Sequence, residues 1–168
     1  MTLLIDGYNL IYASGTWAEM MDEGDIERAR HNMISHISQY LGTGKRRTIV
    51  VFDGRTGHYK GPDRTDFTYG SIKVLFTGRE MKADDKIVEI VKEAVHPREI
   101  TVVTSDRSIQ RQVRALGAAV KESGDFRSEV FKKVKDMEQR SREKGENGYP
   151  LISYEEYMEM LERHEKNS

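Results

Sequence analysis

The stretch Thr2-Leu3-Leu4-Ile5-Asp6-Gly7-Tyr8-Asn9 decides how this chain folds. Four residues with β-branched or apolar side chains are followed directly by a carboxylate and a glycine. Residues 2–5 therefore predict a strand that is buried on both faces, as the strands of a helix-covered parallel sheet are. Asp6 would stand at the carboxyl end of this strand, which is the edge where open α/β sheets bind their ligands.

The same kind of strand recurs along the chain, with helical segments in between. Short runs rich in β-branched residues predict strands at 48–52, 72–76 and 100–104, and a weaker one at 118–120. Apolar residues at helical spacing predict helices at 26–41, 87–94, 109–116 and 126–134, and a last helix from about residue 153. This alternation predicts the α/β class, as a three-layer α/β/α sandwich around a mainly parallel sheet.

The 168 residues predict a single domain over 1–168, in which residues from about 140 to 168 form a charged linker and a C-terminal helix. Cysteine is absent, which excludes disulfide scaffolds, thiolate nucleophiles and zinc fingers. No apolar run approaches the roughly 18 residues of a membrane span, and the N-terminus lacks the basic segment of a signal peptide. We therefore expect a cytoplasmic protein that does not bind membranes.

Acidic residues stand where several of these elements meet the same sheet edge. Asp6, Asp53 and Asp106 each follow a predicted strand, and Asp84 and Asp85 open the helix after the third strand. Each acid except Asp6 has a plain structural alternative. Asp106 suits a helix N-cap, the pair at 84–85 suits a first helical turn, and Asp53 before a glycine suits a turn. Asp6 follows a buried strand, and no helix is obviously capped by it.

Carboxylates that converge repel one another unless a cation lies between them. A site of oxygen ligands without cysteine favours hard divalent ions such as Mg²⁺ or Mn²⁺ over zinc. Such ions bind one or two carboxylates together with substrate phosphate, so hydrolysis of a phosphodiester is the chemistry that this set of acids favours.

Four motifs carry a family resemblance, and they stand in order over roughly residues 1–135. They are Ile5-Asp6-Gly7-Tyr8-Asn9-Leu10-Ile11, Val50-Val51-Phe52-Asp53-Gly54, Thr77-Gly78-Arg79-Glu80-Met81-Lys82-Ala83-Asp84-Asp85-Lys86-Ile87 and Val102-Val103-Thr104-Ser105-Asp106. The sequence thereby resembles the NYN branch of the PIN-like nucleases, and most closely the YacP-like group of ribosome-associated bacterial endoribonucleases.

The resemblance implies a PIN-like fold, a site that depends on Mg²⁺ or Mn²⁺, and single-stranded RNA as substrate, with mRNA on the ribosome as one form of it. The metal ligands and catalytic acids that it implies are Asp6, Asp84, Asp85 and Asp106. Asn9 would orient metal-bound water or phosphate. The resemblance leaves open the role of Asp53 and which of Asp84 and Asp85 lies nearer the metal. Gln110 stands where relatives often carry a further acid, so the number of metals is also open.

The net charge is −1, from 27 basic and 28 acidic residues, which argues mildly against a protein that coats nucleic acid in bulk. Cations and aromatic residues nevertheless cluster in sequence around the acids, where they suit contacts with phosphates and stacking on bases. The RNA-binding candidates are Tyr8, Arg55, Tyr59, Lys60, Arg79, Lys82, Arg107 and Arg111.

Three other functions compete with the nuclease. A P-loop at Gly42-Thr43-Gly44-Lys45 fails because Arg46 stands where Ser or Thr is needed. An aspartyl-phosphate phosphotransferase usually needs a second carboxylate two residues after the first, where Tyr8 stands. A catalytically weak module of the same fold that binds RNA or the ribosome is the remaining alternative. The sequence thus predicts a metal-dependent endoribonuclease acting on single-stranded RNA, with no DNA substrate; it fixes neither the cleavage motif nor the oligomeric state.

Overall fold

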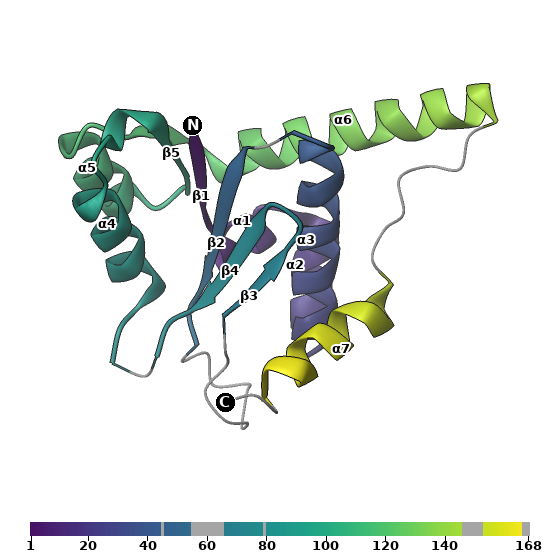
Figure 1. Cartoon of the computed structure of the whole chain (residues 1–168), viewed down its shortest axis with the longest axis horizontal. Helices are drawn as coiled ribbons and strands as arrows, with labels where there is room; N and C mark the ends of the chain where they lie inside the picture. The colour runs from purple at the N-terminus through teal and green to yellow at the C-terminus, as the bar shows by residue number, and fades with distance from the viewer. Residues whose placement is uncertain (45, 55–65, 79, 146–152, 166–168) are drawn as a thin grey trace.

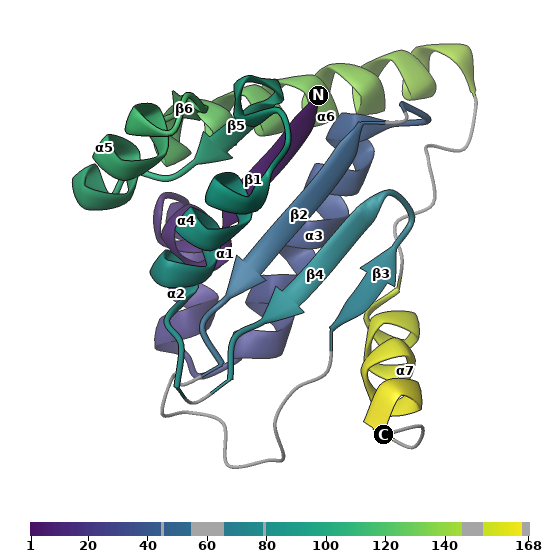
Figure 2. The same cartoon turned by 60° about the vertical axis from the view of Figure 1, so that its left-hand side comes forward.

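A six-stranded sheet lies at the centre of the fold, within the part of the chain that the computed structural model describes, residues 1–44, 46–54, 66–78, 80–145 and 153–165 (Figure 1). The strands in spatial order are β3 (Phe67–Tyr69), β4 (Ile72–Phe76), β2 (Arg47–Phe52), β1 (Thr2–Asp6), β5 (Ile100–Val103) and β6 (Ala119–Lys121). Every neighbouring pair is parallel except β3 and β4, which form an antiparallel hairpin at one edge (Figure 2). The predicted mainly parallel sheet is confirmed.

Helices cover both faces of the sheet and complete the predicted three-layer α/β/α sandwich. One apolar core lies under α1 (Gly7–Tyr12), α2 (Gly15–Asp22), α3 (Ile26–Leu41), α6 (Ser123–Lys144) and α7 (Tyr154–Glu165). The other lies under α4 (Ala83–Glu93) and α5 (Arg107–Ala115), and a 3-10 turn, Pro97–Glu99, leads into β5. Leu3 and Ile5 face the first core and Leu4 faces the second, because successive side chains of a strand point to opposite faces.

Two α-helices and one strand were not expected from the sequence. Helices α1 and α2 occupy residues 7–22, where α1 has only six residues and α2 eight, too few for a clear apolar period. The three-residue strand β3 pairs with β4. Because α1 begins directly after β1, Asp6 stands at its N-cap position, but its side chain makes no capping hydrogen bond, in agreement with the expectation that it caps no helix.

The helix expected to give way to a linker near residue 140 continues to Lys144. After Gly124 in its first turn, no glycine or proline interrupts this helix before Gly145, whose φ of 65° ends it in the left-handed conformation. Gln139 Nε2 donates to Glu143 Oε1 at 3.1 Å, an i, i+4 contact that supports the last turns. The helix therefore ends later than predicted, and residues 146–152 of the predicted linker lie outside the described residues. The prediction of a single domain remains a prediction.

None of the helices in the described parts of the chain has the length and apolar composition needed to cross a membrane.

The turn from β1 into α1 depends on a close approach between backbone and ring. A Cβ on Gly7 would lie 2.4 Å from the Phe52 ring, which is fully buried. We expect Gly7→Ala to lower the free energy of unfolding by about 1–3 kcal/mol, because the packed ring has to shift. Urea unfolding followed by the fluorescence of Trp17, the only tryptophan and a buried one, measures this loss.

The matched control is Gly124→Ala in α6, where nothing lies within 4 Å of the added carbon. This variant should be stabilised by about 0.5–1 kcal/mol, since alanine loses less backbone entropy than glycine in a helix. Equal effects of the two substitutions would contradict the assigned contact.

Candidate active site

Five aspartates from four segments lie at the carboxyl edge of the sheet. Asp6 ends β1, Asp53 follows β2, Asp106 follows β5, and Asp84 and Asp85 lie in the first turn of α4. Strand β1 lies between β2 and β5 in the sheet, so these ends are direct neighbours. The structure thus brings the predicted acids to one place, Asp53 included.

Asp6 is the buried member of this group, with 7% of its surface exposed. The Thr104 hydroxyl donates to Asp6 Oδ2 at 3.0 Å. The pKa of Asp6 is raised to about 6: burial is the largest cause and the charges of Asp84 and Asp106 add to it, whereas the Thr104 hydrogen bond and the Asn9 backbone amide oppose the rise. Asp6 is therefore a carboxyl group whose ionised form is costly in this protein without a cation.

Asp84, which is exposed at the same edge of the sheet, also has a raised pKa. Partial burial raises its pKa first, and the charges of Asp106, Asp85 and Asp53 raise it further; Lys82 acts in the opposite direction. Charges from the ends of two strands, β5 and β2, and from its own helix thus act on one carboxylate. Asp53, whose role the sequence left open, is close enough to contribute.

Asp106 has the plain structural role that the sequence offered as an alternative. Its Oδ1 accepts hydrogen bonds from the backbone N–H groups of Ser108 at 2.7 Å and Ile109 at 2.9 Å, which caps α5. Its own N–H donates to Thr104 Oγ1 at 3.1 Å. The Thr104 hydroxyl therefore joins Asp6 and Asp106. The cap uses one carboxylate oxygen, and the other takes no part in it.

Asn9 connects three segments of the fold. Its Oδ1 accepts from the Ser105 backbone N–H at 2.8 Å and from the Ser123 hydroxyl at 2.7 Å. These bonds fix α1 to the loop after β5 and to the start of α6. Both hydrogen bonds use the side-chain oxygen Oδ1 of Asn9. The predicted contact with water or phosphate would therefore be made by the side-chain nitrogen Nδ2.

Gln110 and Glu122 form a second polar pair that sequence reasoning missed. The buried Gln110 donates through Nε2 to the Thr104 carbonyl at 2.8 Å and to Glu122 Oε1 at 2.6 Å. Hydrogen bonds from Gln110 and Ser105 lower the pKa of Glu122. Glu122 directly follows β6, so its place after a strand was the available signal, weakened by the three-residue length of that strand.

The predicted RNA-binding residues fall into three groups. Lys82, Arg107 and Arg111 are exposed beside the acids. Tyr8 is half-buried; its ring centroid lies 5.1 Å from that of Phe52, and its hydroxyl bonds to Arg30. The remaining candidates lie outside the described residues: Arg55, Tyr59, Lys60 and Arg79.

The acids fit a hydrated hard cation better than an enclosed metal. Within the described ranges, no three His, Asp or Glu side chains lie close enough together to hold a metal ion. Mg²⁺ commonly uses only one or two carboxylates and keeps several waters. The donors at this edge are oxygen atoms. The raised pKa values of Asp6 and Asp84 reflect burial first and the neighbouring negative charges second, and a cation would offset both costs.

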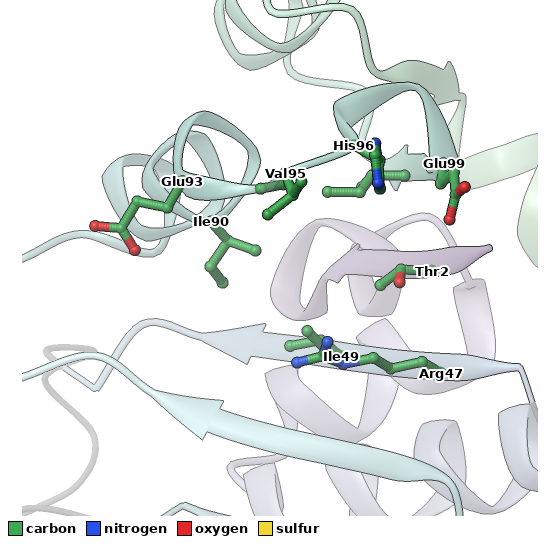
Figure 3. A pocket seen from close by; sticks show the side chains of 10 residues that line it. Thr2, Arg47, Ile49, Ile90, Glu93, Val95, His96 and Glu99 are labelled. Carbon is green, nitrogen blue, oxygen red and sulfur yellow. The ribbon is translucent and has the colours of Figure 1, made fainter.

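A separate hollow lies at the opposite edge of the sheet. Figure 3 shows this cavity of about 400 Å³, which is lined by the first residues of three strands, Thr2, Arg47 and Ile100, and by the end of α4. Because it lies at the amino ends of the strands, it takes no part in the acidic site.

A three-layer fold with acids from neighbouring strand ends and from a helix start defines the class of PIN-like nuclease domains. The chain belongs to the YacP-like NYN domain family, whose sequence profile matches residues 3–166. This membership implies a nuclease-type, RNA-related function.

Two solved structures agree with the assignment. The crystal structure of Rae1 (YacP) from Bacillus subtilis has a TM-score of 0.69 and 27% sequence identity, and the match covers 99% of this chain and 90% of that one. A crystal structure of the same Bacillus subtilis protein with one tryptophan replaced by leucine gives the same score and identity and covers 99% and 95%. No curated protein sequence gives a significant match.

The raised pKa of Asp6 predicts how stability depends on pH. Its pKa is about 6 in the folded state against 3.8 ordinarily, so its contribution to stability is complete below pH 3.8 and is lost as the pH rises through 6. In EDTA at pH 8, Asp6→Asn should therefore have a free energy of unfolding about 1–3 kcal/mol higher than the wild type, measured by urea unfolding. Below about pH 4 the two should converge, and a difference that does not change with pH would contradict the assigned burial cost.

Proposed function

We propose that this protein is an endoribonuclease that depends on a divalent metal and hydrolyses phosphodiester bonds in single-stranded RNA. The observation that carries the proposal is the convergence of Asp6, Asp53, Asp84 and Asp106, whose charges act on one another across separate elements. The α/β/α fold itself does not require an acidic edge of this kind. The chemistry of such an edge is that of a metal-assisted phosphodiesterase, and the nuclease-type family agrees with it.

Asp6, Asp84, Asp85 and Asp106 would hold Mg²⁺ or Mn²⁺. When bound, the metal would activate the attacking water and stabilise the leaving oxygen. The protein's own part is to orient the carboxylates. Thr104 fixes Asp6, the α5 cap fixes Asp106, and Asn9 fixes the first turn of α1 against β5 and α6. Binding groups held this firmly need no reorganisation when substrate arrives.

Helix α5 offers the matching surface for the RNA backbone. Arg107, Arg111 and Arg114 are exposed and stand at i, i+4 and i+7, so they share one face of the helix. This face begins directly after Asp106, and α5 contains no acidic residue. We infer that a strand of RNA whose scissile phosphate lies at the acids places neighbouring phosphates along these arginines. mRNA on the ribosome is the form of substrate that the family resemblance favours.

The alternative is a module of the same fold that binds RNA or the ribosome and cleaves weakly. The absence of a three-ligand metal cluster among the described residues is the observation that favours it. The two functions differ in whether labelled RNA is cut.

Asp6→Asn should abolish cleavage of labelled single-stranded RNA in Mg²⁺ buffer, because it removes the charge of the buried carboxylate that we assign to the metal. The cleavage rate should fall by at least about 100-fold, while the variant keeps its fold and its affinity for RNA. EDTA should likewise abolish cleavage by the wild type. Cleavage by the wild type that survives EDTA, or by the variant at the wild-type rate, would overturn the catalytic assignment. RNA binding without any cleavage would favour the alternative.

The double variant Arg107→Gln/Arg111→Gln should weaken RNA binding uniformly across sequences. The slope of log affinity against log salt should flatten by about 1.4, since each phosphate contact to single-stranded RNA contributes about 0.7. Filter binding at several salt concentrations measures this slope, and co-sedimentation with ribosomes tests the same variant on the presented substrate. The control is Lys92→Gln/Arg98→Gln, two exposed cations away from the acids, which should leave the slope unchanged. Equal slopes for both variants would contradict the proposal that α5 contacts the RNA backbone.

A further inference from the structure

Arg30 is a buried cation that the proposed chemistry does not use. It lies on α3 with 2% of its surface exposed. Its Nη1 is 2.6 Å from Glu27 Oε1, and its Nη2 donates to the Tyr8 hydroxyl. A charge this deep is costly unless it is paired and hydrogen-bonded. The arrangement of its partners is therefore strongly constrained.

Three aromatic rings surround the same guanidinium. Its central carbon lies 5.3 Å from the ring centroids of Tyr8 and Phe52 and 5.2 Å from that of Phe76. Phe52 and Phe76 are the last residues of β2 and β4, so this cluster lies at the carboxyl edge of the sheet. Cation–π contacts of this kind stabilise a desolvated arginine. Because the guanidinium is flat and its hydrogen-bond donors are rigidly placed, few positions of Tyr8 satisfy all contacts.

Tyr8 transmits this constraint to the acids. It lies in the first turn of α1, between Gly7 and Asn9, and Asp6 directly precedes that helix. The turn is therefore held from two sides. Tyr8 fixes it to α3, and Asn9 fixes it to the loop after β5 and to α6.

The contacts of Arg30 continue outward to the C-terminal helix. Tyr157 of α7 is fully buried, and its hydroxyl donates to Glu27 Oε2 at 3.4 Å. Glu27 therefore bridges Arg30 with one carboxylate oxygen and α7 with the other. The Tyr157 ring also packs on His31 and Phe67, with centroids 5.2 and 5.9 Å apart, which seats α7 against α3 and β3 (Figure 1).

We propose that Arg30 is a positioning residue for the acidic site: it clamps Tyr8 and thereby fixes the turn that carries Asp6 and Asn9, and helix α7 completes the clamp through Tyr157 and Glu27. The kinetic part of this proposal rests on the proposed nuclease function. The structural part, that docking of α7 fixes α1, does not. A shift of about 1 Å in reacting groups can cost about 100-fold in rate, so a distant clamp of this kind has a measurable effect.

The test uses Tyr8→Phe and Tyr157→Phe, which each remove one hydroxyl from the clamp and keep the ring. Each should lower kcat for RNA cleavage by about 3–30-fold with KM unchanged. The double variant should be no slower than the slower single variant, because both changes act on the one Glu27–Arg30 unit. Trp17 fluorescence on urea unfolding establishes that each variant is folded under the assay conditions.

Tyr40→Phe is the matched control. Tyr40 lies near the far end of α3, and its hydroxyl donates to Glu129 Oε2 at 3.5 Å, the same tyrosine–glutamate bond away from α1. It should leave kcat unchanged. Wild-type kcat in both clamp variants, additive losses in the double variant, or an equal loss in Tyr40→Phe would each overturn the proposal. A higher KM at constant kcat in Tyr8→Phe would also overturn it and make Tyr8 a direct RNA contact.

Amide hydrogen exchange separates this proposal from the nuclease function. In Tyr157→Phe without RNA or metal, the amides of residues 10–13 at the end of α1 should exchange about 3–10-fold faster than in the wild type, while those of α4 keep their rates. If the wild type cleaves no RNA, the nuclease function fails, and this measurement alone decides the clamp. Unchanged exchange in α1 overturns it. If Tyr157→Phe does not fold, Glu27→Gln takes its place, with the same expected outcome.

Discussion

The burial of one carboxylate, Asp6, is the constraint on which the arrangement of this site depends. An ionised group at the end of a central strand loses most of its hydration, and here one hydroxyl, that of Thr104, replaces part of it. The same hydroxyl accepts the N–H of Asp106, so the ends of β1 and β5 are joined through a single oxygen atom. The neighbouring acids increase the cost, and a cation at this edge would offset it.

Helices on the two faces of the sheet contribute differently to the site. On one face, α4 and α5 bring acids by their first turns and by a helix cap, and α5 adds a row of arginines. On the other face, α3 and α7 hold α1 through a buried arginine. The near-zero net charge of the chain thus conceals an acidic edge with basic residues beside it. A balanced total charge is weak evidence against nucleic-acid binding, because the distribution of charge governs a local contact.

Much of the fold followed from local pattern. The five strands expected from β-branched runs are present, and the stripes that begin at Ile26 and Ile87 form α3 and α4. Helices α1 and α2 and strand β3 were missed because segments of three to eight residues show no reliable period. The end of α6 was misplaced because charged residues suit a solvated helix as well as a linker; only Gly145 marks the boundary.

The sequence by itself determined that acids stand at strand ends and that the parallel sheet brings those ends to one edge, because both follow from the order of residues along each element. Only the tertiary structure decided what each side chain does there. Asn9 holds Ser105 and Ser123, Gln110 bridges to Glu122, and Tyr8 bonds to Arg30, across separations of 12 to 114 residues. No spacing rule predicts such contacts, because they arise from the packing of helices whose relative positions local sequence does not specify.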